Sequence, residues 1–274
     1  MGVLLESSGV DLTIAYHYFM TATHSVPRQF ASTARLFSAQ DFDRLRAAHV
    51  GVVGLGGVGS WAVEALARSG VGRITLVDMD HVAESNLNRQ VQALHSTLGV
   101  EKGSALAARI RDIAPQCAVE VIDGFLTPEN AHDILVGSKS LRPDRVWIDA
   151  TDDLSAKRAM VLCLHQAKQL KNLVVSGAAG GKTDPIRVEA ADLSDATQDA
   201  LLSSLRYDLR KHHGFVRQGK MKILTVVCRQ PTVRQEDCDP TARLACAGYG
   251  SMVTVTATMG MVAAHLAMKR ILER

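Results

Sequence analysis

The sequence predicts an α/β fold: a doubly wound, mostly parallel sheet with helices on both faces and a C-terminal α+β extension. Two observations carry this prediction. Short apolar runs typical of buried parallel strands alternate with helix-like segments as far as residue 181. This alternation is typical of parallel strands joined by helices that cover both faces of a sheet. Beyond residue 181 the alternation ends, although strand-like and helix-like segments continue.

Each expected element follows from a local pattern. The expected strands are 50–53, 74–77, 118–122, 145–149, 173–176, 186–190 and 223–228. The expected helices are 42–49, 61–68, 101–113, about 155–170, 198–212 and a terminal one at 252–268. A further helix is expected to start with Thr127 as its cap and Pro128 at its first position.

Three regions are expected along the chain. Residues 1–28 form an N-terminal extension that is expected to be disordered, and residues 29–181 form a nucleotide-binding core. Residues 182–274 form a C-terminal subdomain that packs on the core and holds a basic segment and a terminal helix.

The composition fits a soluble globular protein. Hydrophobic residues make up 47% and charged residues 22% of the 274-residue chain, and the formal net charge is +3. The first basic residue is Arg28, so no charged start of a signal peptide is present. The apolar stretch 252–268 contains three threonines and a histidine and is near the minimum length for crossing a bilayer. A buried helix is therefore expected there, with membrane contact as the alternative.

Cysteine usage indicates a reducing compartment. The five cysteines are odd in number and have no C-x-x-C spacing. This pattern argues against a disulfide framework and against a four-cysteine zinc site. A cytoplasmic protein without zinc is therefore expected.

A glycine-rich loop follows the first expected strand. Gly54, Gly56 and Gly59 fit G-x-G-x-x-G, with Gly57 between them, and such glycines allow a tight turn, a close phosphate and close helix packing. The start of the next helix offers N–H groups and a positive dipole end to phosphates. Asp78 closes the next strand, where a ribose hydroxyl is bound in such folds. A Rossmann-like nucleotide site is predicted, because a turn that serves only packing leaves Asp78 unexplained.

Side chains beyond Asp78 favour a triphosphate ligand. Asn86, Arg89 and Gln90 follow that strand closely, and a guanidinium group is a planar fork of donors suited to phosphate oxygens. Lys102 opens the next expected helix, from which it could reach a β- or γ-phosphate. Surface positions are the alternative for Arg89 and Lys102.

Two further charged residues extend this interpretation. Asp152 follows the strand 145–149 at the edge where such sheets bind ligands, and its carboxylate could hold Mg²⁺ between phosphates. Arg35 precedes the first helix and is free to reach a reacting group. A helix N-cap is the alternative for Asp152, and a solvated terminus is the alternative for Arg35. On one side of one sheet, these residues would favour triphosphate chemistry over a redox cofactor.

The segment 206–234 carries a local basic field. Eight lysines and arginines occur there against one acid, Asp208, and two histidines lie among them. Such a field suits a nucleic-acid backbone. A solvated helix and loop face is the alternative.

Several of these segments resemble the adenylating core of the E1-like, ubiquitin-activating superfamily. The resemblance covers about residues 30–180 and rests on 54–60, Asp78, 85–90, Lys102 and 151–153. Within the superfamily the chain is most similar to the tRNA threonylcarbamoyladenosine dehydratase branch, over nearly all residues after 28. That likeness rests on the segments 33–37, 57–61, 77–80, 177–181 and 246–251. The lack of C-x-x-C pairs agrees, because activators of sulfur carriers and ubiquitin commonly carry zinc-binding cysteines.

The resemblance implies a reaction that uses ATP and Mg²⁺ on tRNA. ATP adenylates the free carboxylate of the threonylcarbamoyl group on adenosine 37. The activated acyl carbon is then attacked from within the same modification, which closes a ring and releases AMP. The net change is loss of water, and the intramolecular nucleophile needs little further ordering.

The resemblance also implies roles for individual residues. The nucleotide is expected to be bound by Gly54, Gly56, Gly57, Gly59, Asp78, Asp80, Asn86, Arg89, Gln90 and Lys102. The expected catalytic residues are Arg35, Arg89, Lys102 and Asp152, of which Asp152 organises Mg²⁺ and Arg35 enters from the other subunit of a homodimer. The expected partners are tRNA, a second copy of the chain and a sulfur-transfer or cysteine desulfurase system, and no DNA partner is expected.

Three rival functions share part of this pattern. An NAD-linked dehydrogenase shares the glycine loop and Asp78 but gives Arg89 and Lys102 no task. An adenylyltransferase that activates the C-terminus of a ubiquitin-like or sulfur-carrier protein would use the same ATP site with a thiol, for which Cys246 is the best candidate. A small buried cysteine is the alternative for that residue. A catalytically inactive binding scaffold would not need the full set of phosphate-handling residues.

Overall fold

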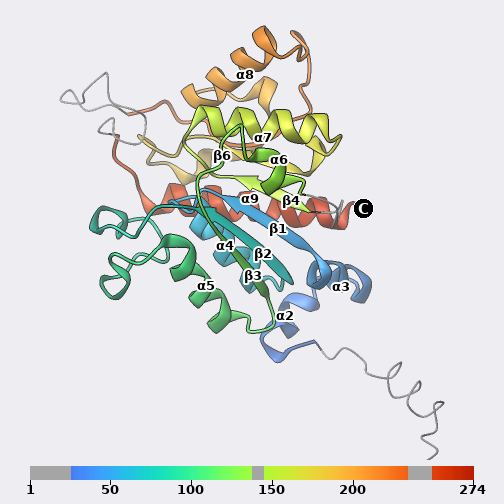
Figure 1. Cartoon of the computed structure of the whole chain (residues 1–274), viewed down its shortest axis with the longest axis vertical. Helices are drawn as coiled ribbons and strands as arrows, with labels where there is room; N and C mark the ends of the chain where they lie inside the picture. The colour runs from blue at the N-terminus through green and yellow to red at the C-terminus, as the bar shows by residue number, and fades with distance from the viewer. Residues whose placement is uncertain (1–25, 138–144, 234–248) are drawn as a thin grey trace, which may run out of the picture.

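The computed structural model of the chain describes residues 26–137, 145–233 and 249–274 (Figure 1). Most of the extension expected over 1–28 lies outside these residues, and so does Cys246. The first described elements are η1 (Arg28–Phe30) and α2 (Ala31–Ala34).

Seven strands of the described chain form one sheet in the order β3-β2-β1-β4-β5-β7-β6. They are β1 (His49–Val53), β2 (Arg73–Asp78), β3 (Ala118–Asp123), β4 (Val146–Asp149), β5 (Leu173–Ser176), β6 (Val188–Asp192) and β7 (Leu224–Cys228). All neighbouring strands are parallel except β6 and β7, which are antiparallel. The predicted mostly parallel sheet is therefore confirmed.

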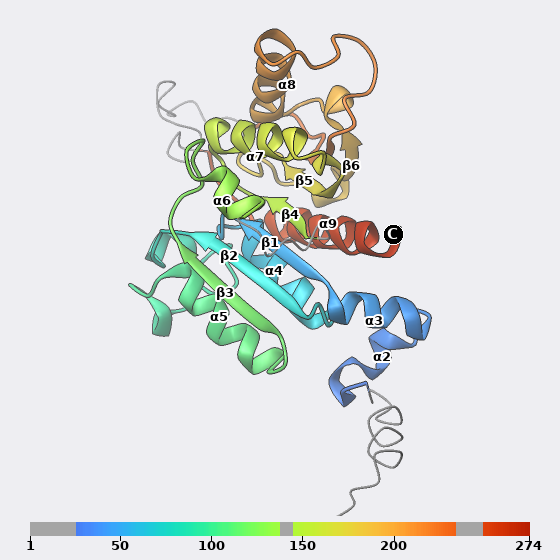
Figure 2. The ribbon, with the colours of Figure 1, turned by 45° about the vertical axis from the view of Figure 1, so that its right-hand side comes forward.

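Helices cover both faces of this sheet (Figures 1 and 2). One face is covered by α3 (Ala39–Ala47), α4 (Gly59–Arg68), α5 (Lys102–Ile113) and α9 (Val253–Leu272). The other is covered by α6 (Ala131–Leu135), α7 (Leu154–Gln166) and α8 (Ala200–His212). Short 3₁₀ turns connect them: η2 (Glu84–Asn86), η3 (His95–Thr97), η4 (Leu170–Asn172), η5 (Pro185–Arg187) and η6 (Leu193–Asp195). The doubly wound prediction is confirmed.

Burial on both faces explains why the central strands read as continuous apolar runs. In β1, Val52 packs into the core beneath α4 and α9, and Val53 packs into the core beneath α7. Gly51 lies under the fully buried ring of Trp147, where an added Cβ atom would lie 2.1 Å from a ring carbon. Glycine at this position therefore makes room for the tryptophan.

The residues after 181 complete the same sheet. β7 pairs in parallel with β5, and β6 forms the antiparallel edge. α9 packs along α4, and a Cβ atom on Gly260 would lie 2.4 Å from the Val58 carbonyl oxygen, so the glycine permits this close approach. Most of one side of α9 is buried, as expected. Among the described helices, none has the length and apolar character needed to cross a bilayer. A boundary at residue 181 falls between β5 and β6 and stays a proposal.

The expected helix start at Thr127 is wrong. α6 begins at Ala131, and Thr127 and Pro128 lie in a turn before it. The Asn130 side chain accepts a hydrogen bond from the Thr127 N–H (2.8 Å) and donates one to the Phe125 carbonyl (2.9 Å). The Ala131 N–H also donates to the Thr127 carbonyl at 2.9 Å, so the chain makes a single helix-like turn here before α6 begins.

Candidate active site

The glycine loop joins β1 to α4 beside the carboxyl end of β4. Gly54 has a φ of +86°, and a Cβ atom on it would lie 2.8 Å from the Ala150 carbonyl oxygen. A Cβ atom on Gly59 would lie 1.8 Å from the Gly54 carbonyl oxygen, so both positions require glycine. No atom lies within 4 Å of a Cβ position on Gly56 among the described residues, which leaves space beside the loop. No side chain caps α4 at Val58, and of its first N–H groups that of Ser60 donates to the Gly56 carbonyl at 3.1 Å, which leaves the others for an anion.

The Asp78 carboxylate is held by two backbone N–H groups. Its Oδ2 accepts from Leu55 at 2.6 Å and its Oδ1 accepts from Asp80 at 2.8 Å. The Asp80 carboxylate in turn accepts a hydrogen bond from Lys102 Nζ at 2.7 Å. Lys102 is only 6% exposed, so Asp80 fixes an ammonium group at the start of α5.

Arg89 lies in the connection after η2 and is held in place by its neighbours. Its Nη1 donates to the Ser85 carbonyl at 2.7 Å and to Asn88 Oδ1 at 2.8 Å. The Trp61 indole N–H of α4 donates to the Arg89 carbonyl at 2.9 Å. These contacts orient the guanidinium group beside the glycine loop.

The neighbours Asn86 and Gln90 are buried. Asn86 Oδ1 accepts from the Ala83 N–H at 3.1 Å, and Gln90 Oε1 accepts from Gln92 Nε2 at 3.2 Å. The same Gln92 nitrogen donates to the Leu55 carbonyl at 2.9 Å, which ties this segment to the glycine loop.

The loop after β4 carries two adjacent carboxylates, Asp152 and Asp153, which lie in different environments. Asp153 caps α7, because its Oδ1 accepts from the Ala156 N–H at 2.8 Å. The Asp152 side chain is exposed in the cavity wall and has no hydrogen bond or ion pair with the described residues. The described chain holds no cluster of three or more His, Cys, Asp and Glu residues suited to a metal. A cation at Asp152 would therefore share phosphate oxygens and water, as Mg²⁺ commonly does.

A fully buried ion pair lies beneath this loop. Lys157 Nζ donates to Asp149 Oδ1 at 3.1 Å and to the Ser176 carbonyl at 2.7 Å, and both charged side chains are 0% exposed. Asp149 Oδ1 also accepts from the Thr151 hydroxyl at 2.8 Å. The pair links the ends of β4 and β5 and fixes the loop that carries Asp152.

The glycine loop, the segment after β2 and the loop after β4 surround one cavity of about 1020 Å³ at the carboxyl ends of the strands. Ten expected site residues line it: Gly54, Gly56, Gly57, Asp78, Asp80, Asn86, Arg89, Gln90, Lys102 and Asp152. Gly59 does not line the cavity but packs against the Gly54 carbonyl and so allows the tight turn of the loop. Arg35 is exposed at the end of α2, next to the helix that enters the amino end of β1 (Figure 2). Within one chain, Arg35 therefore does not share this edge of the sheet with the other charged residues.

The opposite wall contains residues that the sequence did not indicate. Lys182 is 2% exposed, and its Nζ donates to the Gln198 carbonyl at 2.6 Å and to two carbonyls at the end of β7. Burial lowers the pKa of Lys182 below its ordinary value. Asp199 caps α8 and also accepts from the Ala178 N–H at 2.8 Å. The sequence could have indicated Asp199 as a helix cap, because it directly precedes a helix. Its hydrogen bond with the Ala178 N–H follows no sequence pattern.

A model of the ThiF family matches residues 28–274 of the chain. The chain belongs to the ThiF family. This ThiF-family chain is 38% identical over 261 residues to tRNA threonylcarbamoyladenosine dehydratase of Haemophilus influenzae. The match covers 93% of this chain and 97% of that protein. The protein of the same name from Escherichia coli is also 38% identical and covers 90% of this chain and 94% of its own.

Solved structures agree with these relatives. The crystal structure of the E. coli enzyme in complex with ATP has a TM-score of 0.79 at 38% identity, covering 89% of this chain and 94% of that one. The complex of that enzyme with AMP gives the same TM-score. The sulfur carrier protein adenylyltransferase of Thermus thermophilus is 37% identical over 115 residues, which is 42% of this ThiF-family chain. The dehydratases thus match more than twice as much of the chain as this adenylyltransferase does.

Proposed function

We propose that this chain is an ATP-dependent tRNA threonylcarbamoyladenosine dehydratase that cyclises the modified adenosine at position 37. The cavity carries the proposal: Asp78, Arg89, Lys102 and Asp152 converge with a glycine loop in a chain that matches enzymes of this name over almost its full length. The E. coli relative was solved with ATP, the substrate of an adenylation, and with AMP, which leaves when the activated acyl group reacts further.

The residues of the cavity divide the adenylation among them. Each Asp78 oxygen accepts one backbone N–H and keeps a lone pair for a ribose hydroxyl. The glycine loop and the start of α4 bind phosphate oxygens. Arg89 and Lys102 stabilise the charge that grows on the polyphosphate while the substrate carboxylate bonds to the α-phosphorus and pyrophosphate leaves.

The second step needs little from the protein beyond exclusion of water. A nucleophile of the same modified nucleoside attacks the acyl carbon, and the bond from that carbon to AMP breaks. The cavity wall of Lys182, Gln198 and Asp199 encloses the side opposite the phosphates. Mg²⁺, with Asp152 as its protein ligand, would neutralise charge on the phosphates.

The carrier-protein alternative requires an activated thiol at the cavity. None of the cysteines in the described ranges lines it. Burial raises the pKa of the Cys117 thiol to about 11, which makes the reactive thiolate scarce at neutral pH. Cys246 lies outside the described residues.

The decisive experiment is incubation of the protein with ATP, Mg²⁺ and tRNA that carries the modified adenosine. We expect the released nucleoside to lose the mass of one water molecule, with one AMP and one pyrophosphate formed for each ring closed. Calorimetry should detect binding of ATP and not of NAD. Unchanged nucleoside mass, or tight NAD binding without ATP binding, would overturn the proposal.

We infer further that the active unit is a homodimer in which Arg35 acts on the partner's nucleotide site. The support is that Arg35 is exposed and distant from the cavity of its own chain. Arg35→Ala and Arg89→Ala are each expected to be inactive, and mixing them should restore part of the activity through hybrid dimers. A strictly monomeric protein, or exchanged subunits without rescue, would contradict this prediction.

Two further expectations belong with this function. A cytoplasmic location and a sulfur-transfer or cysteine desulfurase partner stay predictions. Co-purification from cells with a tagged chain, followed by identification of the bound proteins, tests the partner.

A further inference from the structure

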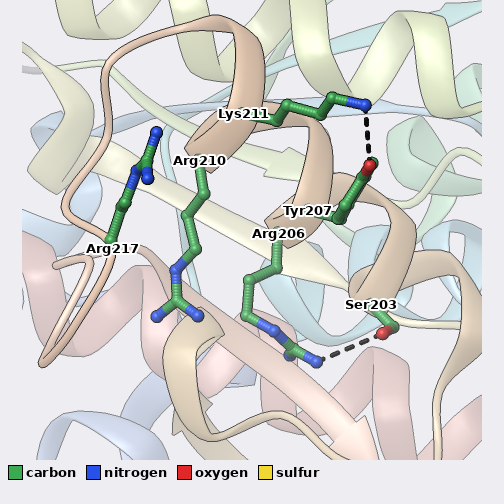
Figure 3. A pocket seen from close by; sticks show the side chains of 6 residues that line it. All are labelled: Ser203, Arg206, Tyr207, Arg210, Lys211 and Arg217. Carbon is green, nitrogen blue, oxygen red and sulfur yellow. Dashed lines mark hydrogen bonds between the residues drawn. The ribbon is translucent and has the colours of Figure 1, made fainter.

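A second pocket of about 490 Å³ lies outside the cavity, on the exposed face of α8 (Figure 3). Its lining residues are Ser203, Arg206, Tyr207, Arg210, Lys211 and Arg217. Five of them recur at the three- and four-residue spacing of one helix face, and Arg217 comes from the loop after the helix. No acid lines the pocket, so its charge is uniformly positive in the described chain.

In the basic segment 206–234, some side chains are already bonded to other groups of the chain and others are not. Lys220 pairs with Asp195, and Arg229 pairs with Glu189. Arg206 donates to the carbonyls of η6 and of residue 196, at 3.0 and 2.7 Å, and so fastens the preceding turn to α8. The predicted basic field is therefore not one continuous surface.

Two guanidinium groups of the pocket have donors to spare. Arg210 donates through Nε to the Val216 carbonyl at 3.2 Å, and its terminal nitrogens have no partner among the described residues. Arg217 has no hydrogen bond or ion pair within the described chain. Burial, and then the like charge of Arg210, lower the pKa of Arg206 below its ordinary value. A bound anion would relieve this repulsion.

Tyr207 adds an aromatic surface to the charges. Tyr207 is 61% exposed, so its ring is accessible from solvent. Lys211 Nζ lies 5.1 Å from the ring centroid and donates to the phenol oxygen at 2.8 Å. Lys211 thus holds the hydroxyl end of the ring, and the exposed ring can stack on a planar base. Stacking on tyrosine beside basic groups is typical of proteins that bind unpaired nucleotides.

The pocket is connected to the cavity by α8 itself. Ala200 and Leu201, at the start of this helix, line the cavity, and Arg210 lies nine residues further along the axis. At 1.5 Å per residue this is about 14 Å. A loop of RNA whose modified base enters the cavity can therefore reach the pocket with a neighbouring nucleotide.

We propose that this pocket binds an unpaired nucleotide of the RNA substrate, with the base stacked on Tyr207 and its phosphates held by Arg210 and Arg217. The proposal rests on the proposed function, since it assigns the substrate of that site a second contact. It predicts recognition of a single-stranded loop and not of duplex RNA, because paired bases do not expose their faces.

Three variants test the pocket by tRNA binding at several salt concentrations. Tyr207→Leu should weaken binding about 5- to 150-fold without changing the salt dependence, because it removes a stacking contact. Arg210→Gln with Arg217→Gln should flatten the slope of log K against log salt by about 0.7 for each lost phosphate contact. Tyr207→Phe keeps the ring and should bind like the parent.

Lys220→Gln is the matched control, because Lys220 belongs to the same basic segment but pairs with Asp195 outside the pocket. It should leave binding unchanged, and a duplex RNA should not compete with tRNA for the parent. ATP affinity should be equal in all variants, which shows that each is folded. If the parent cyclises the nucleoside but Tyr207→Leu and the double arginine variant bind tRNA normally, the pocket proposal is wrong and the function holds. If the parent neither binds nor modifies tRNA, the proposed function itself fails.

Discussion

Arg89→Ala and Asp152→Ala are each expected to lower turnover by about 10²- to 10³-fold, the usual loss when one preorganised group that stabilises transition-state charge is removed. The Arg89 guanidinium is fixed by the Ser85 carbonyl and Asn88, so little reorganisation is needed when charge develops on the phosphates. Asp152 has no hydrogen bond or ion pair in the described chain, so its carboxylate is available for the Mg²⁺ ion that we propose there. The measurement is the rate of AMP release with modified tRNA at saturating ATP.

The controls separate charge from geometry. Arg89→Lys keeps the positive charge but loses the planar fork, so it should recover only part of the activity. Arg111→Ala removes an exposed arginine from α5 away from the cavity and should turn over like the parent. Near-parental turnover in Arg89→Ala or Asp152→Ala would remove that residue from the site.

The half of the site that the sequence predicts is encoded by contiguous residues. Gly54, Gly59 and Asp78 lie within one strand–loop–helix–strand unit, so local spacing already determines that they meet. Arg89 and Lys102 follow in the next connection. The chain needs no long-range information to bring these groups together, and the structure places them on one cavity.

The other half depends on strand order, which no local pattern specifies. β4 lies beside β1, and β5 beside β4, only because the sheet has the order found here, and Lys182 and Asp199 reach the cavity only through this order. The sequence interpretation also put Arg35 on the same side of the sheet as the other charged residues, but Arg35 precedes α3 and β1 and does not line the cavity of its own chain.

The sequence contains one indication of the buried pair of Lys157 and Asp149. Lys157 lies four residues before Val161 and seven before Leu164, on the buried stripe of α7, where an unpaired lysine would be very unfavourable. A charge at such a position requires a partner, and Asp149 at the end of β4 supplies it. The Asp149 Oδ2 atom is buried without a hydrogen-bond partner in the described chain, so Lys157 is the charge that keeps this carboxylate stable.

Lys157→Met is therefore expected to destabilise the protein by about 3–5 kcal/mol, because it leaves the Asp149 charge buried and unpaired. The measurement is urea unfolding, read as a lower midpoint at unchanged slope. Adding Asp149→Asn to Lys157→Met should restore part of the lost stability, since the amide keeps an acceptor for Thr151 without a buried charge. Loss of the ion pair between Lys157 and Asp149 should also raise the Mg²⁺ concentration needed for half-maximal turnover, because Asp149 anchors the loop that carries Asp152. A free energy of unfolding for Lys157→Met within about 1 kcal/mol of the parent would contradict this prediction. So would a double variant that is no more stable than the single variant Lys157→Met.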